Sequence, residues 1–337
     1  MAARPSSCTF STDGAGAVKK LSTLCGLIAV SLVIFVAVFS VVHRPLVVGE
    51  IQKQMDYKQS YARSLASPKI VIFAGSNGRY SHRCEVMTRT LGLPCVNASI
   101  GVGIGLDFQL AQWRPLLRAG DLVYMPLEYS QYRVSTAEMQ GGLQNALLVH
   151  SHRDTLWSLD ARRIAAAYGS FDLPFLIQGA VEMALNRHGF KRRSSTDNLT
   201  LQGDERGHTA DVGIAYATRL RDSRAESSAV PAQSDAIDVL DAFLRQLRDA
   251  GVRVVGGLPT VPDSVNVDSS DVDRLRRIYE DAGQQFIVLP NRSRYPVDCF
   301  FDTLYHLNEG CQEAHSAALS NVLLDRIQGA RRARDPS

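Results

Sequence analysis

The sequence has little imbalance of charge and no internal repeat, and these absences exclude several classes of protein. Its 37 Lys and Arg against 34 Asp and Glu leave a net charge of +3, which is too weak to predict a nucleic-acid partner. The 25 Gly and 13 Pro are near average and follow no fixed period, which excludes collagen and coiled-coil arrays. A hydrophobic content of 45% with 21% charged residues argues against wholesale disorder. We therefore expect one folded domain of roughly 250–290 residues.

The sequence also lacks the motifs of common metal and nucleotide sites. Its six cysteines form no CxxC pair and no paired Cys/His pattern, which argues against a zinc site. The run Gly101-x-Gly103-x-Gly105 follows the second predicted strand and lacks the spacing of a dinucleotide-binding fingerprint. We therefore expect no metal and no cofactor.

Only one stretch, residues 24–42, is apolar enough to cross a lipid bilayer. It contains no charged residue, and as a helix it would be about 28 Å long, close to the thickness of a hydrocarbon core. The alternative is a cleaved signal peptide, which has a shorter apolar region and a small-x-small cleavage site that residues 39–44 lack. The pattern predicts a cytoplasmic tail at 1–23, a membrane anchor at 24–42 and a polar helical stalk at 45–67. Residues 45–337 are expected outside the cytosol.

Four cysteines follow the predicted stalk, while Cys8 and Cys25 lie in the tail and the anchor. An even number of cysteines in an oxidising compartment permits two disulfides, and the count alone leaves three pairings open. Buried free thiols are the alternative. Since local pairing closes two loops of about a dozen residues each, we predict two local disulfides. The predicted pairs are Cys84 with Cys95 and Cys299 with Cys311.

Residues 68–327 alternate short apolar runs with helical segments, which predicts an α/β domain with a parallel sheet. The predicted strands are 69–74, 93–97, 120–125, 252–257 and 285–289. The predicted helices are 84–91, 106–117, 236–250, 270–282 and 309–327. A mostly helical insertion at about 134–232 interrupts this pattern, with helix-like segments at 162–168 and 175–187 and a basic cluster at 187–193 that is typical of a solvated loop. Residues 328–337 are expected to be a disordered tail.

Polar side chains follow three of the predicted strands. Ser76 ends the first strand and opens a helix, Asn97 ends the second just before Gly101, and Asp302 and His306 follow the fifth. In an open α/β sheet, ligands bind at the carboxyl ends of the strands. A serine nucleophile needs a base that a carboxylate orients, and an oxyanion hole needs converging donors. We therefore predict Ser76, His306 and Asp302 as catalytic residues, with Asn97 and a backbone N–H near Gly101 as oxyanion donors.

Three segments resemble the first, second and fifth sequence blocks of the SGNH (GDSL-like) hydrolases. They are Lys69-Ile-Val-Ile-Phe-Ala-Gly-Ser-Asn77, Val96-Asn-Ala-Ser-Ile-Gly101 and Asp302-Thr-Leu-Tyr-His-Leu-Asn308. Together with residues 120–129, they are similar to the membrane-anchored branch linked to bacterial exopolysaccharides. The resemblance implies a flavodoxin-like three-layer sandwich. It also implies that Ser76 is the nucleophile, His306 the base, Asp302 its orienting carboxylate and Asn97 an oxyanion donor.

The sequence departs from this family pattern at several positions. Asn77 replaces the usual Asp of the first block, and Glu128 lies where the third-block Gly-x-Asn-Asp is expected. Three residues, rather than two, separate Asp302 from His306. Glu128 is therefore a candidate second carboxylate, although a structural role is the favoured interpretation. His82, close to Ser76 in sequence, is expected on the surface.

The resemblance implies an extracytoplasmic acyl esterase or O-acetyltransferase that acts on a polysaccharide through an acyl-Ser76 intermediate. The expected location is the inner (cytoplasmic) membrane, with a single pass and a periplasmic domain. Expected partners are a polysaccharide or acylated carbohydrate, the membrane, and a membrane-bound acyltransferase or secretion complex. The alternative hypothesis is a catalytically inactive assembly or binding subunit of an exopolysaccharide machine, which the missing third block favours.

Overall fold

The computed structural model of the chain describes residues 14–42, 46–169, 177, 180–182, 184–185, 196–223 and 227–334. The predicted basic cluster at 187–193 and most of the helix-like segment at 175–187 lie outside the described residues.

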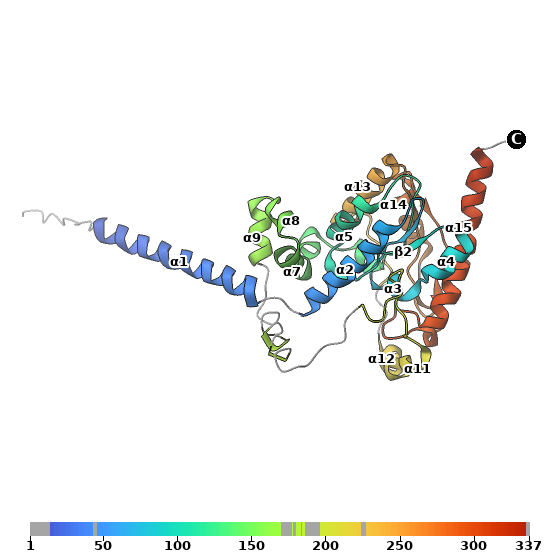
Figure 1. Cartoon of the computed structure of the whole chain (residues 1–337), viewed down its shortest axis with the longest axis horizontal. Helices are drawn as coiled ribbons and strands as arrows, with labels where there is room; N and C mark the ends of the chain where they lie inside the picture. Colours follow the sequence, from blue (N-terminus) through green and yellow to red (C-terminus); the bar gives the residue numbers. More distant parts are fainter. Residues whose placement is uncertain are drawn as a thin grey trace, which may run out of the picture.

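The chain begins with an apolar helix, α1 (Gly14–Val42), which extends away from the other elements in Figure 1. Its stretch Gly16–Ala37 is long and apolar enough to span a membrane, and none of that stretch is buried inside the protein. The predicted anchor at 24–42 therefore falls within a helix that begins earlier than expected. These properties are compatible with a single-pass membrane anchor.

The expected polar stalk is instead a helix packed against the domain. In α2 (Leu46–Ser64), Val48, Met55 and Ala62 are almost fully buried and recur at intervals of one heptad. Lys58 is buried on the same helix, and its charge obscured the apolar spacing in the sequence. The prediction of a solvated stalk is therefore wrong, because one face of α2 belongs to the core.

The centre of the domain is a parallel sheet of five strands in the order β2-β1-β3-β4-β6. The strands are β1 (Ile70–Ile72), β2 (Cys95–Asn97), β3 (Leu122–Met125), β4 (Arg253–Gly256) and β6 (Gln285–Phe286). Each lies within or overlaps one of the five predicted runs. Ile72 pairs with both Asn97 and Tyr124, so the carboxyl ends of the three neighbouring strands meet at one edge. The order, counted along these five strands, is that of a doubly wound flavodoxin-like sheet.

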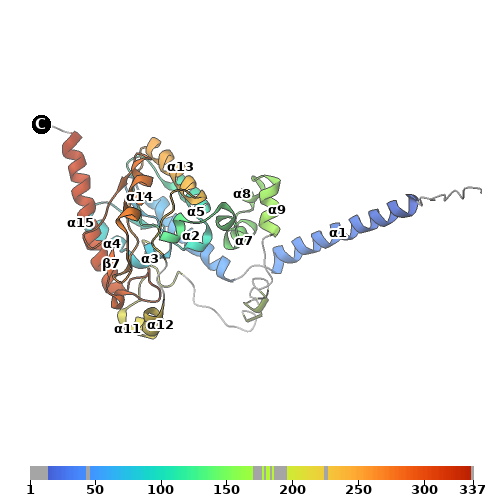
Figure 2. The same cartoon turned by 180° about the vertical axis from the view of Figure 1, so that it is seen from behind.

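Helices cover both faces of the sheet (Figures 1 and 2). Val71 and Val123 point into one core, which also holds apolar side chains from α5 (Leu106–Trp113), α13 (Asp235–Asp249) and α14 (Ser269–Glu280). Ile70, Ile72 and Leu122 point into the opposite core with α4 (Cys84–Leu91) and α15 (Glu309–Arg334). Neighbouring strand residues face opposite sides, so the β-branched runs fill both cores. The predicted α/β architecture with a parallel central sheet is confirmed.

The elements between β3 and α13 are short helices in the described part of the chain. They are η3 (Tyr129–Tyr132), α6 (Thr136–Met139), α7 (Gly142–Ser151), α8 (Arg153–Trp157), α9 (Ala161–Gly169), α11 (Ala210–Gly213), η4 (Ile214–Tyr216) and α12 (Ala217–Asp222). Residues of α7, α8 and α9 form their own apolar cluster with Val48 and Met55 of α2. This cluster attaches the insertion to the domain through α2.

The helix that Ser76 was predicted to open is α3 (Ser76–Ser81), and the 3₁₀ turn η2 (Arg114–Leu116) lies within the predicted helix 106–117. The 3₁₀ turns η1 (Val102–Ile104) and η5 (Val297–Cys299) were not predicted. A second sheet pairs β5 (Val261–Pro262) with β7 (Arg294–Tyr295). The expected disordered tail at 328–337 is also wrong in part, because α15 continues to Arg334.

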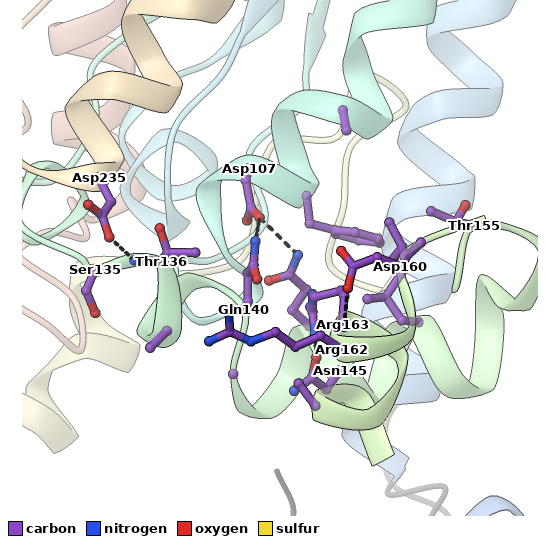
Figure 3. Close-up of a pocket in the computed structure, with 18 residues that line it drawn as sticks. Asp107, Ser135, Thr136, Gln140, Asn145, Thr155, Asp160, Arg162, Arg163 and Asp235 are labelled. Atoms are coloured by element: carbon purple, nitrogen blue, oxygen red, sulfur yellow. Dashed lines mark hydrogen bonds between the residues drawn. The ribbon is translucent and has the colours of Figure 1, made fainter. Parts of the chain in front are cut away.

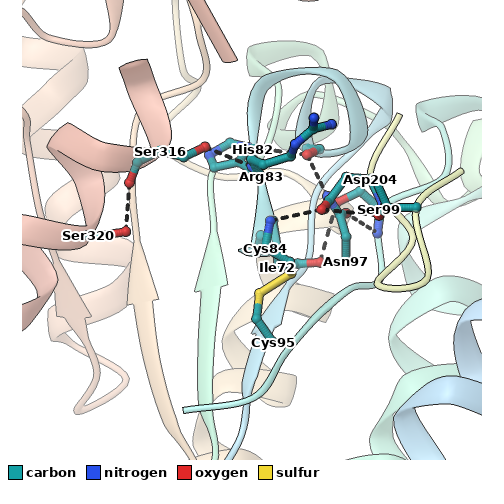
Figure 4. Close-up of a disulfide and its surroundings, with 12 residues drawn as sticks. Ile72, His82, Arg83, Cys84, Cys95, Asn97, Ser99, Asp204, Ser316 and Ser320 are labelled. Carbon is teal, nitrogen blue, oxygen red and sulfur yellow. Dashed lines mark hydrogen bonds between the residues drawn. A yellow bond between two sulfur atoms is a disulfide. The ribbon is translucent and has the colours of Figure 1, made fainter. Parts of the chain in front are cut away.

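Both predicted disulfides are present. Cys84–Cys95 joins the first residue of α4 to the first residue of β2, with a Cα–Cα distance of 5.2 Å (Figure 4). Cys299–Cys311 joins η5 to the first turn of α15, with a Cα–Cα distance of 5.6 Å. The prediction of local pairing is therefore confirmed, and Cys25 in α1 is a free, exposed thiol.

We predict that replacing Cys299 and Cys311 together by serine lowers the free energy of unfolding by about 2–4 kcal/mol, because the closed loop constrains the unfolded chain. Chemical unfolding of the full chain in detergent micelles measures the change. Cys25→Ser is the matched control and should leave stability unaltered. A double variant as stable as the control, or peptide mapping that finds a crossed pairing, would contradict the prediction.

Candidate active site

The candidate nucleophile lies in a tight turn at the end of β1. Ser76 is the first residue of α3, and Gly75 precedes it. A Cβ atom on Gly75 would lie 2.6 Å from both Glu128 Oε1 and Val102 Cγ1. The turn therefore needs glycine at this position, because two other segments of the chain approach the backbone beside Ser76.

Ser76, His306 and Asp302 form a continuous series of hydrogen bonds. Ser76 Oγ lies 2.8 Å from His306 Nε2, and His306 Nδ1 lies 2.6 Å from Asp302 Oδ1. With Nδ1–H donating to Asp302, Nε2 is the free acceptor for the Ser76 hydroxyl. The structure thus brings together all three predicted catalytic side chains, although 230 residues separate the serine from the histidine.

The loop that carries Asp302 and His306 is held at both ends. Cys299–Cys311 closes it, and the Asn308 N–H donates to Cys299 O at 2.7 Å. Inside it, the Phe301 N–H donates to His306 O at 2.8 Å. This folded loop accommodates three residues between the carboxylate and the imidazole without separating them.

Tyr80 covers one face of the His306 ring. The two rings are stacked, with centroids 4.0 Å apart and planes inclined by 11°. Tyr80 also contacts Phe301, and the Arg79 guanidinium lies 4.8 Å from the centre of the Tyr80 ring. Sequence reasoning missed Tyr80, because only its position one turn after Ser76 in α3 directs it toward the histidine. The stacking restricts rotation of the imidazole.

The surroundings of His306 favour its neutral form. Burial lowers the pKa of His306, and the hydrogen bond and charge of Asp302 only partly oppose that shift. Burial would raise the pKa of Asp302, but its hydrogen bond and attraction to His306 outweigh burial, so the net shift is downward. At neutral pH the imidazole therefore has the protonation state of a general base beside an ionised carboxylate.

Glu128 lies on the other side of Ser76. Its Oε1 is 3.4 Å from Ser76 Oγ and accepts the Asn77 N–H at 3.2 Å. The side chain is buried, and Glu128 is the N-cap residue of η3, three residues after the end of β3. The candidate second carboxylate therefore contacts the nucleophile. Glu128 offers hydrogen-bond acceptors beside Ser76 Oγ, whereas an oxyanion formed by attack of that oxygen would need hydrogen-bond donors.

Asn97 does not point an amide donor at Ser76. Its Nδ2 donates to Gly78 O and to Asp204 Oδ1, both at 2.9 Å, which uses both amide protons. The expected oxyanion role for this side chain does not hold in this geometry, because Asn97 instead joins β2 to α3 and to the insertion. Gly101 is extended, its carbonyl accepts from Gln109, and no described residue accepts its N–H.

A buried polar network beneath the turn also escaped sequence reasoning. Asp204 accepts the Cys84 N–H at 2.9 Å in addition to the Asn97 amide (Figure 4). Lys58 of α2 donates to Ser99 O at 2.5 Å. Burial and the nearby Arg79 hold the pKa of Lys58 well below its usual range, while burial raises the pKa of Asp204. No local pattern marks these residues, since each depends on a partner distant in sequence.

His82 is buried rather than on the surface, so that expectation is wrong. Its Nδ1 lies 3.3 Å from Gly78 O, and its Nε2 lies 3.2 Å from His315 Nε2. Burial lowers the pKa of His82 to about 4. The ring packs between α3 and α15 and contacts neither Ser76 nor Asp302. Among the described residues, no group of three or more His, Cys, Asp or Glu is placed to hold a metal ion.

Comparison with known proteins identifies no family. No family model matches the chain, and no curated protein is similar to it. A similar solved structure is the crystal structure of protein YxiM from Bacillus subtilis, with 10% identity and a TM-score of 0.35. The alignment covers 79% of this chain and 58% of that chain, so this protein spans less than two thirds of its length. A TM-score this low does not establish a shared fold.

We predict that Asn97→Ala destabilises the protein by about 1–3 kcal/mol, because it leaves Gly78 O and Asp204 Oδ1 buried without their donor. Thermal unfolding of the full chain measures the loss. Asn266→Ala is the matched control, since that exposed amide contacts only Asp268. If Asn97→Ala were as stable as Asn266→Ala, the bracing role assigned to Asn97 would be wrong.

Proposed function

We propose that this protein is an SGNH-like acyl esterase or O-acyltransferase that acts on an acylated polysaccharide. The observation that carries the proposal is the hydrogen-bonded series Asp302–His306–Ser76 at the carboxyl edge of the parallel sheet. This arrangement has the parts that activate a serine hydroxyl, namely a neutral base and a carboxylate that orients it.

In the first half of the proposed reaction, Ser76 Oγ attacks the carbonyl carbon of the ester, and its proton passes to His306 Nε2. Asp302 stabilises the resulting imidazolium through Nδ1–H. The tetrahedral intermediate then collapses as the ester C–O bond breaks, and His306 returns the proton to the departing sugar oxygen. The backbone N–H groups of Ser76 and Gly101 are the donors that we assign to the oxyanion.

In the second half, water or a sugar hydroxyl attacks the acyl-Ser76 carbonyl. His306 removes the proton from the attacking oxygen and returns it to Ser76 Oγ as the acyl–serine bond breaks. Water as acceptor makes the protein an esterase, whereas a sugar hydroxyl makes it a transferase. A transferase supplied by a partner such as a membrane-bound acyltransferase would form acyl-Ser76 from that partner's acyl group, and His306 would then protonate the partner's leaving group instead of a sugar oxygen.

The proposed location is the inner membrane, with the domain in the periplasm. One apolar helix precedes the domain, and two disulfides lie within the domain. Structural disulfides persist in oxidising compartments and are rare in the cytosol. Both observations support a domain on the extracytoplasmic side.

A second candidate function is a catalytically inactive binding or assembly subunit of the same kind of machine. Glu128 favours it, since its carboxyl group lies 3.4 Å from Ser76 Oγ and offers no donor to an oxyanion forming nearby. Asn97, whose amide protons are both engaged, supplies no compensating donor. The two functions differ in whether Ser76 transfers an acyl group.

We predict that Ser76→Ala and His306→Ala each lower kcat/KM for 4-nitrophenyl acetate by about 10³-fold or more, because nucleophile and base act as one unit. The rate of 4-nitrophenolate release by the full chain in detergent micelles measures the effect. Asp302→Asn should cost less. It should also move the acid limb of the pH profile further below pH 6.5, since Asp302 raises the pKa of His306.

The matched control is Ser158→Ala, which changes an exposed serine after α8 and should retain the parent rate. Thermal unfolding of each variant separates lost chemistry from lost folding. A parent protein whose ester hydrolysis survives Ser76→Ala would exclude the enzyme hypothesis at this site and favour the binding subunit.

We also predict that alkaline phosphatase fused after Ser64, at the end of α2, is active in cells, because that enzyme needs an oxidising compartment to form its disulfides. A fusion after Gly14 lacks the apolar helix and should be inactive. An inactive fusion after Ser64 would place the domain in the cytosol and overturn the proposed location.

A further inference from the structure

A large cavity lies between the insertion and the sheet domain (Figure 3), and Ser76, His306 and Asp302 are not among the residues that line it. Its volume is about 890 Å³, and helices α5, α6, α7 and α9 line it together with the start of α13. This volume lies in the range of sites that bind small organic molecules or short segments of polymers.

Several polar side chains in the cavity wall make only long hydrogen bonds or have atoms without a hydrogen-bond partner in the described part of the chain. Asp107 Oδ2 accepts from the amides of Gln140 and Gln144 at 3.5 and 3.4 Å, close to the upper limit for hydrogen bonds. Asp107 Oδ1, Gln144 Oε1 and Arg163 Nη2 are shielded from solvent and have no partner within the described part of the chain. Leaving such atoms unpaired costs free energy. A small rotation of these side chains toward the cavity would let a ligand with hydroxyl groups satisfy both the acceptors and the donor.

The same cavity has apolar surface beside these groups. Phe108, Leu148 and Leu159 contribute hydrocarbon, while Ala111 and Ala166 leave space. A sugar presents hydroxyl groups at the edges of its ring and C–H groups on the faces. It therefore matches a cavity wall that has both polar groups and apolar surface. A lipid chain would leave the unpaired atoms unsatisfied. The carboxylates of Asp107, Asp160 and Asp235 line the cavity together with the guanidinium groups of Arg162 and Arg163, so its wall carries charges of both signs.

One short segment joins the cavity to the neighbourhood of Ser76. At its start, Val102 approaches the backbone of Gly75, and at its end Gly105 lies against the Gln144 side chain, whose Oε1 would be 2.8 Å from an added Cβ. The candidate nucleophile and the cavity therefore lie near opposite ends of residues 102–105. A chain of linked sugars can contact both places at once, which a single small molecule cannot do.

We propose that this cavity binds a segment of a polysaccharide chain and holds it beside the Ser76 site. The choice of a polysaccharide over other polyhydroxylated ligands rests on the proposed function. Binding itself needs no chemistry at Ser76, so the cavity would serve either an enzyme or a binding subunit.

The test measures sugar binding by the full chain in lipid nanodiscs. A printed array of neutral and uronic-acid-containing oligosaccharides, two to six sugars long, selects the best probe, and calorimetric titration gives its affinity. Ala166→Trp fills the cavity from an exposed position on α9 and should weaken binding at least tenfold. Asp107→Ala should weaken it about tenfold through loss of a charged acceptor. Ala165→Trp, at the adjacent exposed position outside the cavity lining, is the matched control and should bind as the parent does.

The outcomes separate this inference from the proposed function. A parent that binds no oligosaccharide on the array, or an Ala166→Trp variant that binds as tightly as Ala165→Trp, overturns the cavity assignment even if Ser76 is active. Cavity-dependent binding by a parent without Ser76-dependent ester hydrolysis overturns the enzyme hypothesis and upholds the cavity.

Discussion

The hydrogen bond between Ser76 and His306 is the contact on which the rest of the site depends. It joins the end of β1 to a loop 230 residues later, so it forms only when the sheet aligns its strand ends and the loop is held in place. The disulfide Cys299–Cys311 closes that loop, and Tyr80 stacks on the imidazole. Each of these features restricts the orientation of one ring, which suits an imidazole that must receive a proton along one direction.

The two acidic side chains at the site have opposite expected effects on catalysis. Asp302 stabilises positive charge on His306, as a serine-based acyl transfer requires. Glu128 places a second carboxylate against the same hydroxyl. Catalysis would then depend on backbone N–H groups to offset that carboxylate. This conflict is the physical reason why an active enzyme and an inactive subunit are both reasonable hypotheses for the same three side chains.

Helix α2, which follows the apolar helix α1, belongs to the floor of the site. Lys58 of α2 donates to Ser99 O, and Asn97 and Asp204 extend the buried network to α3 and the insertion. Buried charges of this kind are tolerated when each has partners. The network therefore couples the position of α2 to the turn that carries Ser76, and residues of α7, α8 and α9 pack with Val48 and Met55 of the same helix.

Local patterns in the sequence were sufficient for the five strands, the main helices, the apolar N-terminal helix and the two disulfides. Alternating apolar runs and short cysteine loops depend on neighbours along the chain, so they can be read without a fold. The strand-end rule also predicted that Ser76, His306 and Asp302 would meet. The buried face of α2, the bracing role of Asn97, the burial of His82 and the stacking of Tyr80 were decided only by tertiary structure. In each case a contacting residue is distant in sequence, so no local pattern could reveal the contact.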